Sequence, residues 1–451
     1  MKDDKHPEPA RSTRRDFLKT AGAATAGVLM TDWARSRSFA IAAPRVIGAN
    51  DRIGFGVIGC GGMGMQHIRS LMGHAEQSNI RITAVCDIYE PRKEAAKALT
   101  GATLYHEYQK LIADPAVDAV LIATPEHWHA QMALDAMEAG KDVYLEKPMT
   151  RYLDEATKVL EMAKKSGRIL QVGSQLCSHA KWRRAKELIR EIGKPLWSQT
   201  SYCRNTPEGE WNYPIEDAKV GPGGNLDWQA FLGPAKKVPY DPQRFFRWRK
   251  YWDYSSGIAG DLYPHRIYPL MIVLGAELPV RVASTGGLYI QKMREPNSTG
   301  GCYQPEDWTK ELPAGLIPDR DVPDTVHMLA DFPSGHTLLV AGCTANEQGL
   351  PTMVRGHRAS MFVSHENNEI IIRPERPYAE ELEEIRERVE GADGINDHEI
   401  NFIECMRTRK EPTCGPDLAY AGMVTVALAE ISFRENKMAR FDPQKKTIIR
   451  G

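Results

Sequence analysis

Short apolar runs alternate with amphipathic stretches over the first part of the chain. The apolar runs predict buried strands, and the stretches between them, with apolar residues at helical spacing, predict helices. We expect strands over residues 52–59, 80–87, 117–125, 142–148 and 168–173, and helices over 63–72, 91–99, 129–140 and 154–166. Strands that alternate with helices, with little room for hairpins, predict a parallel sheet covered on both faces.

The pattern changes after about residue 175. A helix over 181–191 and a strand over 196–202 are expected before an irregular stretch, 204–257, that is rich in Pro, Gly, Trp and Tyr. Alternating polar and apolar residues then predict strands over 280–290, 325–332, 336–342 and 369–374. Residues 292–324 are expected to form an extended surface insertion, and the acidic run 378–391 a solvated helix or linker.

Two folded parts follow from this change of pattern. Residues 43–175 are predicted to form a doubly wound α/β domain. Residues 176–451 are predicted to form an α+β domain with a large open, mainly antiparallel sheet. The resemblance described below implies that this domain binds substrate and carries the oligomer contacts. A length of 451 residues fits such a division.

The N-terminal 42 residues have the three parts of an export signal. Arg14 and Arg15 precede an apolar run over 20–30, and small residues follow over 38–44. This order is typical of a twin-arginine signal peptide, whereas a disordered basic tail is the alternative. The run of about 11 apolar residues is too short to span a bilayer of about 30 Å. We therefore expect a periplasmic or otherwise exported protein that uses the twin-arginine export machinery and has no membrane span when mature.

Composition excludes several partner classes. Lys plus Arg (58) and Asp plus Glu (59) leave a net charge of −1, so no electrostatic feature favours nucleic acid. The eight cysteines include no C-x-x-C pair, and we predict neither a disulfide framework nor a metal site.

A glycine motif follows the first predicted strand. Gly59, Gly61 and Gly64 form G-x-G-x-x-G at the start of a predicted helix, with Gly62 and Met63 inside the motif. Backbone N–H groups and the helix N-terminus can there approach a pyrophosphate. Asp87 ends the second strand, where its carboxylate can accept hydrogen bonds from the adenosine ribose. The motif predicts a bound NAD, and Arg92 nearby leaves NADP open.

Two segments carry a family resemblance. ATPEHWHAQMALDAMEAGKDVYLEKPMT (123–150) and GDLYPH (260–265) resemble the Gfo/Idh/MocA oxidoreductases, which include glucose–fructose oxidoreductase and inositol dehydrogenases, and the likeness covers nearly the whole mature chain. It implies a Rossmann domain in which Lys147 lies beside the nicotinamide and contacts the reacting hydroxyl. It also implies roles for Asp261 and His265, and cofactor contacts at Thr124, Pro125, His129 and Glu146. Glu126 departs from the Asn that is common in the family after Thr-Pro.

Residue chemistry supports the same three residues as catalytic. Oxidation of an alcohol requires a base for its hydroxyl proton, and His265 has a suitable ordinary pKa. Lys147 can stabilise the developing alkoxide or act as the base. Asp261, four residues before His265, would share its helix face if a helix starts near Asp261. The alternatives are an N-cap for Asp261, a structural histidine, and a Lys147–Glu146 ion pair.

Candidate substrate contacts come from the irregular stretch. QRFFRWRKYWDY (243–254) interleaves four cations with six aromatic residues, which predicts either the wall of a sugar-binding cleft or a packing role. Arg204, Asn205, Trp211 and Tyr263 are further candidate contacts with the substrate.

Export and dinucleotide binding together constrain the function. A route that exports folded proteins lets the enzyme fold around its cofactor, which must then stay tightly bound. We expect an NAD-dependent oxidoreductase that acts on a secondary hydroxyl of a sugar, cyclitol or glycoside. The alternatives are a redox-neutral NAD-dependent glycosidase or lyase and a non-catalytic carbohydrate-binding protein. Family members are often dimers or tetramers, so a homo-oligomer is expected.

Overall fold

The computed structural model describes residue 48 and residues 51–217, 221–391 and 394–449. The predicted signal peptide, residues 1–42, lies outside these residues, as does the predicted start of the mature chain. None of the helices in the described ranges has the length and apolar character needed to cross a membrane.

A parallel sheet forms the N-terminal half. Its strand order is β3-β2-β1-β4-β5-β6, and every neighbouring pair is parallel. The strands are β1 (Ile53–Ile58), β2 (Ile80–Cys86), β3 (Thr103–Tyr105), β4 (Ala119–Ile122), β5 (Asp142–Glu146) and β6 (Leu170–Gly173). β1, β4 and β5 are buried along their whole length, as the centre of a sheet covered on both faces requires. The predicted doubly wound α/β fold is confirmed, and of its strands the pattern missed only the short edge strand β3.

Helices connect these strands. They are α2 (Gly62–Gly73), α3 (Ala75–Ser78), α4 (Glu90–Thr100), α5 (Tyr108–Ile112), α6 (Glu126–Glu138) and α7 (Leu153–Ser166). Pro91 lies in the first turn of α4, where its missing N–H leaves no helical hydrogen bond unmade. α6 begins directly after the Thr-Pro of the resemblance segment, so its N-terminus lies at the carboxyl end of β4.

A second sheet dominates the C-terminal half. Its path is β17-β16-β15-β14-β7-β12-β11-β8-β18-β19, with β13 also paired to β7. The strands are β7 (Pro195–Asn205), β8 (Arg281–Gly287), β11 (Thr325–Asp331), β12 (Thr337–Cys343), β13 (Ala345–Asn346), β14 (Met353–Gly356), β15 (Ala359–Val363), β16 (Glu369–Pro374), β17 (Ile385–Arg388), β18 (Ala439–Asp442) and β19 (Thr447–Ile449). All pairs are antiparallel except β7 with β12, which confirms the mainly antiparallel sheet.

The expected helix within the acidic run 378–391 is wrong. The run contains the end of a 3-10 helix, η4 (Arg376–Tyr378), and the edge strand β17, which pairs antiparallel with β16. Ile385 lies opposite Ile372 and packs against the core, while Arg386 and Arg388 are exposed. Alternation over four residues thus overrides the helical spacing of the charges, and those charges protect a sheet edge.

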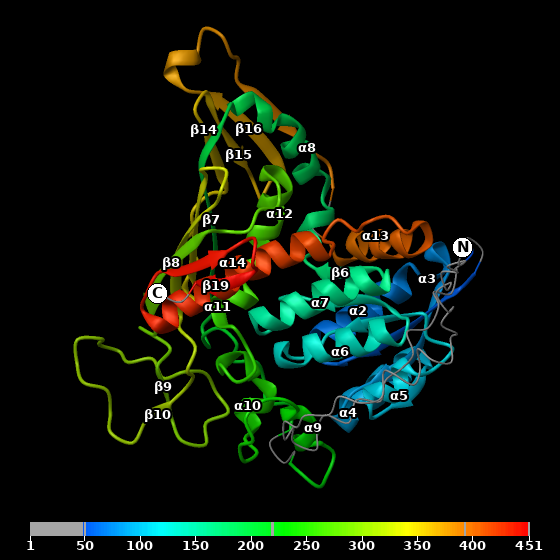
Figure 1. The fold of residues 1–451 in the computed structure, drawn as a ribbon. Coiled ribbons are helices and arrows are strands. Elements are labelled where there is room, and N and C mark those ends of the chain that lie inside the picture. Colours follow the sequence, from blue (N-terminus) through cyan, green and yellow to red (C-terminus); the bar gives the residue numbers. More distant parts are fainter. Residues whose placement is uncertain (1–47, 49–50, 218–220, 392–393, 450–451) are drawn as a thin grey trace, which may run out of the picture. The chain divides into compact units, whose positions relative to one another are not determined.

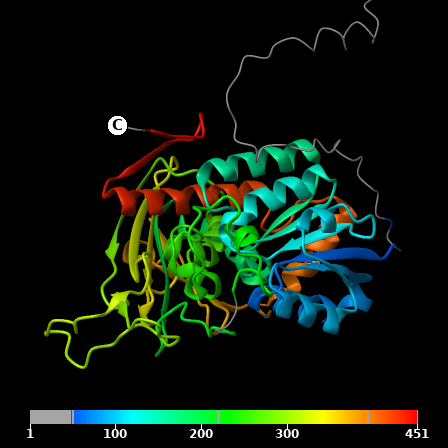
Figure 2. The same cartoon turned by 90° about the horizontal axis from the view of Figure 1, so that it is seen from below.

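Helices cover one face of the second sheet. They are α8 (Ala180–Leu188), α11 (Gly257–Asp261), α12 (Pro264–Leu274) and α14 (Pro416–Glu435); 3-10 helices η1 (Gln175–Ser178) and η2 (Ile189–Ile192) flank α8. α14, red in Figures 1 and 2, contacts both β8 and α7 and so joins the two halves. α13 (Ile395–Thr408) returns to the N-terminal half and packs on α2.

The irregular stretch contains short helices that reach the N-terminal half. They are α9 (Trp228–Leu232), α10 (Pro242–Phe246) and η3 (Trp248–Lys250). We call residues 213–217 and 221–254 the cover segment. Its aromatic side chains form a cluster with Tyr89, and backbone hydrogen bonds join it to residues 88 and 90. The predicted insertion 292–324 carries a small ladder of β9 (Met293–Arg294) and β10 (Ile317–Pro318).

Candidate active site

The glycine motif forms a loop that fits a pyrophosphate. Gly59 has a φ of +88°, and a Cβ on Gly64 would lie 1.8 Å from the Gly59 carbonyl oxygen. A Cβ on Gly62 would meet nothing within 4 Å, so the space over this residue is open. α2 begins at Gly62 without a capping side chain or an acidic residue in its first turn, and Met63 is its second residue. The backbone N–H groups at this uncapped helix start can donate hydrogen bonds to a phosphate, and the open space over Gly62 leaves room for one. A dinucleotide pyrophosphate requires both features.

Asp87 lies directly after β2 and against this loop. Its Oδ2 accepts a hydrogen bond from the backbone N–H of Cys60 at 2.7 Å, and its Oδ1 accepts one from Tyr89 at 2.9 Å. Burial raises the pKa of Asp87, and the nearby Arg92 guanidinium opposes that rise. The carboxylate therefore holds the glycine loop against the end of β2, the position expected for a ribose contact.

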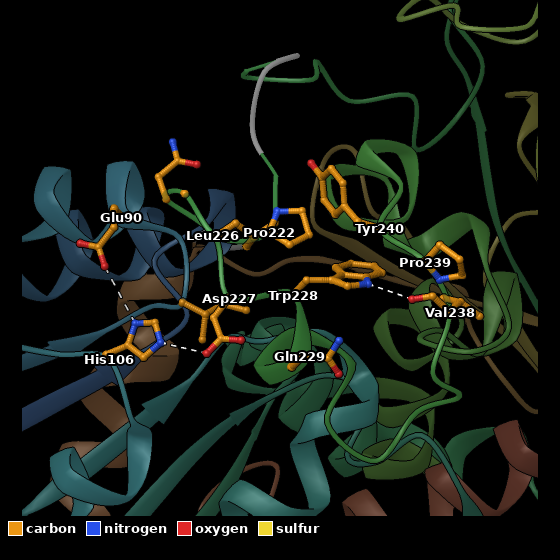
Figure 3. A pocket seen from close by; sticks show the side chains of 14 residues that line it. Glu90, His106, Pro222, Leu226, Asp227, Trp228, Gln229, Val238, Pro239 and Tyr240 are labelled. Atoms are coloured by element: carbon orange, nitrogen blue, oxygen red, sulfur yellow. Dashed lines mark hydrogen bonds and ion pairs between the residues drawn. The ribbon is translucent and has the colours of Figure 1, made fainter.

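A pocket opens next to Asp87. It has a volume of about 560 Å³ and lies between the chain after β2 and the cover segment (Figure 3). Ile88, Glu90 and His106 line it from the N-terminal half, and residues 222–229 and 238–240 line it from the cover segment. His106 bridges the two sides, with Nδ1 3.9 Å from Glu90 and Nε2 3.2 Å from Asp227.

His129 fastens two turns together at the carboxyl ends of β4 and β5. Its Nε2 lies 2.9 Å from the carbonyl oxygen of Thr124, and its Nδ1 lies 2.7 Å from that of Pro148. Burial lowers the pKa of His129. Both ring nitrogens thus face backbone, so His129 shapes the loop of Thr124 and Pro125 and the turn after Lys147.

Glu146 takes part in a buried charged network that the sequence analysis missed. Its Oε1 lies 2.9 Å from Nε2 of His67, whose Nδ1 lies 2.7 Å from Oε1 of Glu399 on α13. Burial alone would lower the pKa of His67, but its hydrogen bonds to the Glu146 and Glu399 carboxylates outweigh burial and raise the value to about 9. His67 is therefore an imidazolium between two carboxylates. Glu146, predicted to contact the cofactor, directs its carboxylate to His67 and to the backbone N–H of Lys147.

Lys147 and Asp261 form a buried ion pair. The Lys147 Nζ lies 2.8 Å from Oδ1 and 2.8 Å from the backbone oxygen of Asp261. Arg249 donates to Oδ1 at 3.0 Å, and the indole of Trp211 donates to Oδ2 at 2.9 Å. Burial would raise the pKa of Asp261, but Lys147 and Arg249 hold it well below its usual range. The alternative Lys147–Glu146 side-chain ion pair does not form, because the ammonium points to Asp261.

His265 lies in the first turn of α12, near this ion pair. Burial and the Lys147 ammonium lower the pKa of His265 to about 3, so its imidazole is neutral at any working pH. Within the described ranges its ring makes no hydrogen bond and contacts Tyr202, with ring centroids 5.5 Å apart. The predicted shared helix face is wrong: α11 ends at Asp261 and α12 begins at Pro264. Pro264 has no N–H to continue α11, yet suits the first turn of a new helix.

The predicted substrate contacts separate into two groups. Arg204 donates to Glu210 at 3.0 Å and to the Tyr202 hydroxyl at 2.7 Å, and it is charged and partly exposed near His265. Asn205 ends β7 and is exposed. Tyr263, in contrast, is fully buried and its hydroxyl donates to the Val326 carbonyl, so it braces β11 and is no substrate contact.

The aromatic and cationic run 243–254 has a mainly structural role. Phe245, Phe246, Tyr251 and Tyr254 belong to the buried aromatic cluster, while Arg249 alone of its cations donates to Asp261. The sequence did not distinguish Arg249 from the other cations of this run. The only signal for its contact with Asp261 was that the run lies shortly before GDLYPH (260–265).

Glu126, the departure from the family pattern, joins the two halves. It is fully buried at the start of α6 and accepts hydrogen bonds from the Ser255 hydroxyl at 2.9 Å and the Ser256 N–H at 2.7 Å. Burial raises the pKa of Glu126 to about 7. It holds the segment leading into α11, and hence Asp261, against the end of β4.

Three sequence profiles match the chain. One, described as an oxidoreductase family with an NAD-binding Rossmann fold, matches residues 53–174, and one described as its C-terminal α/β domain matches residues 235–440. The third, the twin-arginine translocation signal sequence, matches residues 12–31 and confirms the predicted export route.

The names of similar proteins describe activities on carbohydrates and cyclitols. A glycosyl hydrolase family 109 protein of Shewanella baltica is 27% identical over 286 residues, which cover 57% of this chain and 54% of that protein. An inositol 2-dehydrogenase/D-chiro-inositol 3-dehydrogenase of Lactiplantibacillus plantarum is 32% identical over 159 residues, or 34% and 45% of the two chains. The chain thus spans about half the length of these curated relatives. A levoglucosan dehydrogenase, solved with NADH and levoglucosan, superposes with a TM-score of 0.63 at 18% identity over 88% of this chain and 99% of that one, and shares the fold.

Proposed function

Because the chain belongs to the Gfo/Idh/MocA family of NAD-binding oxidoreductases, we propose that it oxidises or reduces a secondary hydroxyl of a sugar, cyclitol or glycoside after export. The observation that carries this proposal is the Lys147–Asp261 pair beside a neutral His265. The substrate class is supported by the named activities of the curated relatives.

The geometry gives each residue a role. NAD, held by the glycine loop and Asp87, supplies the hydride acceptor. His265 is neutral and its ring has no hydrogen bond among the described contacts, so it is available to take the hydroxyl proton. Its pKa of about 3 makes it a weaker base than the ordinary imidazole from which the sequence analysis argued. Two of the three Lys147 hydrogens go to Asp261, and the third remains for the substrate oxygen, whose developing negative charge the ammonium stabilises. Arg204 and Asn205 are proposed to bind further hydroxyls.

We also propose that the cofactor is tightly bound. The cover segment fastens to the chain directly after Asp87 through Glu90 N–H to the Asn225 oxygen at 2.9 Å and Asp227 N–H to the Ile88 oxygen at 3.1 Å. The aromatic cluster around Tyr89 reinforces this closure. Release of a nucleotide from this corner would have to disturb contacts between the two halves.

A redox-neutral NAD-dependent glycosidase is the second candidate. The glycosyl hydrolase family 109 relative favours it, and so does the export signal, because a cofactor that cannot exchange outside the cell must be regenerated in place. His265 would again take the hydroxyl proton, and Lys147 would again stabilise the negative charge on the substrate oxygen. The Lys147–Asp261 pair beside a neutral His265 favours either activity over a non-catalytic sugar-binding protein.

One experiment separates the candidates. The protein from the exported fraction is incubated with a panel of sugars and glycosides, and cofactor absorbance and sugar products are followed together. Net cofactor reduction, or exchange between two sugars, supports the oxidoreductase. Release of free sugar from a glycoside without added acceptor supports the glycosidase. A preparation that shows neither, or whose activity survives K147M, contradicts both.

We further infer that the mature chain divides into two domains, residues 43–175 and residues 176–451.

We also infer a homo-oligomer that forms through the open face of the second sheet. Leu329 is 47% and Trp197 39% exposed on strands of that sheet, and the proposed contact would bury both side chains. Light scattering coupled to gel filtration measures the oligomer, and L329E should dissociate it.

A further inference from the structure

The Arg92 guanidinium lies over the glycine loop. Arg92 is in the first turn of α4, five residues beyond Asp87. Its Nη1 lies 3.2 Å from the position that a Cβ on Gly61 would take, and its charge opposes the raised pKa of Asp87. An arginine in this corner has the planar fork and permanent charge that bind a phosphate. The ribose contact expected of Asp87 lies in the same corner.

Three aromatic rings fix the position of this guanidinium. Its carbon lies 5.6 Å from the centroid of the Tyr89 ring, 5.4 Å from that of Phe245 and 5.5 Å from that of Phe246. Phe245 and Phe246 belong to α10 in the cover segment, and they pack edge-on against Tyr89. The guanidinium is therefore held in place by both halves of the protein.

One edge of the Arg92 guanidinium, formed by Nε and Nη2, is already paired with a carboxylate. Nε lies 3.2 Å from each carboxylate oxygen of Glu216, and Nη2 lies 2.6 Å from Oε1. Glu216 belongs to the cover segment and lies 124 residues away in the sequence. The bidentate pair neutralises Arg92, so with Asp87 the corner carries one net negative charge. A 2′-phosphate would meet that charge and a neutralised guanidinium, of which the Nε–Nη2 edge is already paired with Glu216.

We propose that Glu216 makes the site select NAD over NADP, by neutralising the guanidinium that would otherwise bind the 2′-phosphate of NADP and by pairing with its Nε–Nη2 edge. Glu216 acts through Arg92 and is a specificity-determining residue. Asp87 supplies the first negative charge and Glu216 the second. This inference rests on dinucleotide binding by the glycine loop and on no step of the proposed reaction.

The nucleotide content of the purified protein tests the proposal. The full chain folds where both dinucleotides are present, so extraction from denatured protein, followed by chromatography, reports which one it selected. We expect NAD in the wild type. In E216Q the ratio of NADP to NAD should rise about tenfold or more, which one charge-assisted phosphate contact supports. In R92Q/E216Q the ratio should return to the wild-type value.

A matched control separates selectivity from general damage. Arg184 and Glu387 form a second bidentate pair, at 2.7 and 2.6 Å, between α8 and β17. E387Q breaks that pair and should leave the nucleotide ratio unchanged. A wild-type ratio in E216Q, an equal change in E387Q, or a raised ratio that persists in R92Q/E216Q would each overturn the proposal.

Direct titration decides the case in which no nucleotide is retained. Dissociation constants for NAD⁺ and NADP⁺ are then measured by calorimetry on the same variants. Loss of retention contradicts the tight-binding proposal but does not bear on the role of Glu216. If E216Q leaves the preference for NAD⁺ over NADP⁺ unchanged, the role of Glu216 is contradicted. D87S and D87S/E216Q extend the test: the double variant should bind NADP⁺ about tenfold or more tighter than D87S alone. Equal binding by these two proteins would also overturn the role of Glu216.

Discussion

The buried His67 should make the stability of this protein fall at alkaline pH. His67 is fully buried between Glu146 and Glu399, with hydrogen bonds of 2.9 and 2.7 Å. Replacement by Gln keeps the size and one donor, but it removes the positive charge and leaves two buried carboxylates without it. H67Q therefore isolates the effect of the imidazolium on the fold.

The size and the sign of the effect follow from the pKa. In the folded protein the pKa of His67 is raised from 6.5 to about 9 by the two carboxylates, against the effect of burial. Such a rise corresponds to about 3 kcal/mol of stability linked to the proton. Because the folded state binds this proton more tightly, the contribution is complete below pH 6.5 and is lost as the pH rises through about 9.

Urea unfolding measures this loss. The free energy of unfolding of the wild type and of H67Q is determined at about pH 6 and about pH 10. The wild type should be the more stable at the lower pH, and the difference between the two proteins should shrink by about 3 kcal/mol at the higher pH. H327Q is the matched control, because His327 is exposed on β11. A difference between wild type and H67Q that stays constant with pH would refute the imidazolium assignment.

Three further substitutions test the site. K147M should lower kcat about 100-fold or more, because the ammonium beside the reacting oxygen is lost, while nucleotide extraction should show unchanged cofactor content. H265Q should lower kcat by about 100-fold or more. Burial and Lys147 lower the pKa of His265 to about 3, so the imidazole stays unprotonated above about pH 4. The pH profile of wild-type kcat/KM should therefore show no fall from protonation of His265 above about pH 4. G64A should abolish nucleotide retention or lower the Tm in thermal unfolding, because its Cβ would lie 1.8 Å from the Gly59 oxygen.

Local pattern was sufficient for the N-terminal half. Apolar runs bounded by helices predicted five of its strands, because a parallel strand buried on both faces must be apolar along its length. The glycine motif was also recognised from the sequence alone. At Gly64 only glycine fits, because a Cβ there would lie 1.8 Å from the Gly59 oxygen. Pattern failed at the acidic run 378–391, where four residues of alternation at a sheet edge compete with helical charge spacing.

At the site, the sequence identified residue types but could not show their contacts. Lys147, Asp261 and His265 were predicted together, but their arrangement depends on the helix break at Pro264 and on an ion pair between residues 114 positions apart.

By itself, then, the sequence determined the export signal and the dinucleotide fold, because these depend on short-range sterics and periodicity. The residues proposed as reactive came from a family resemblance and from the chemistry of their side chains. Only the tertiary structure decided that Asp261 is held by Arg249 and Trp211, that His67 lies between carboxylates, and that Glu216 occupies Arg92. Those contacts join separate elements, up to 332 residues apart between His67 and Glu399. No local pattern encodes them, because each forms only when tertiary packing brings its partners within hydrogen-bond distance.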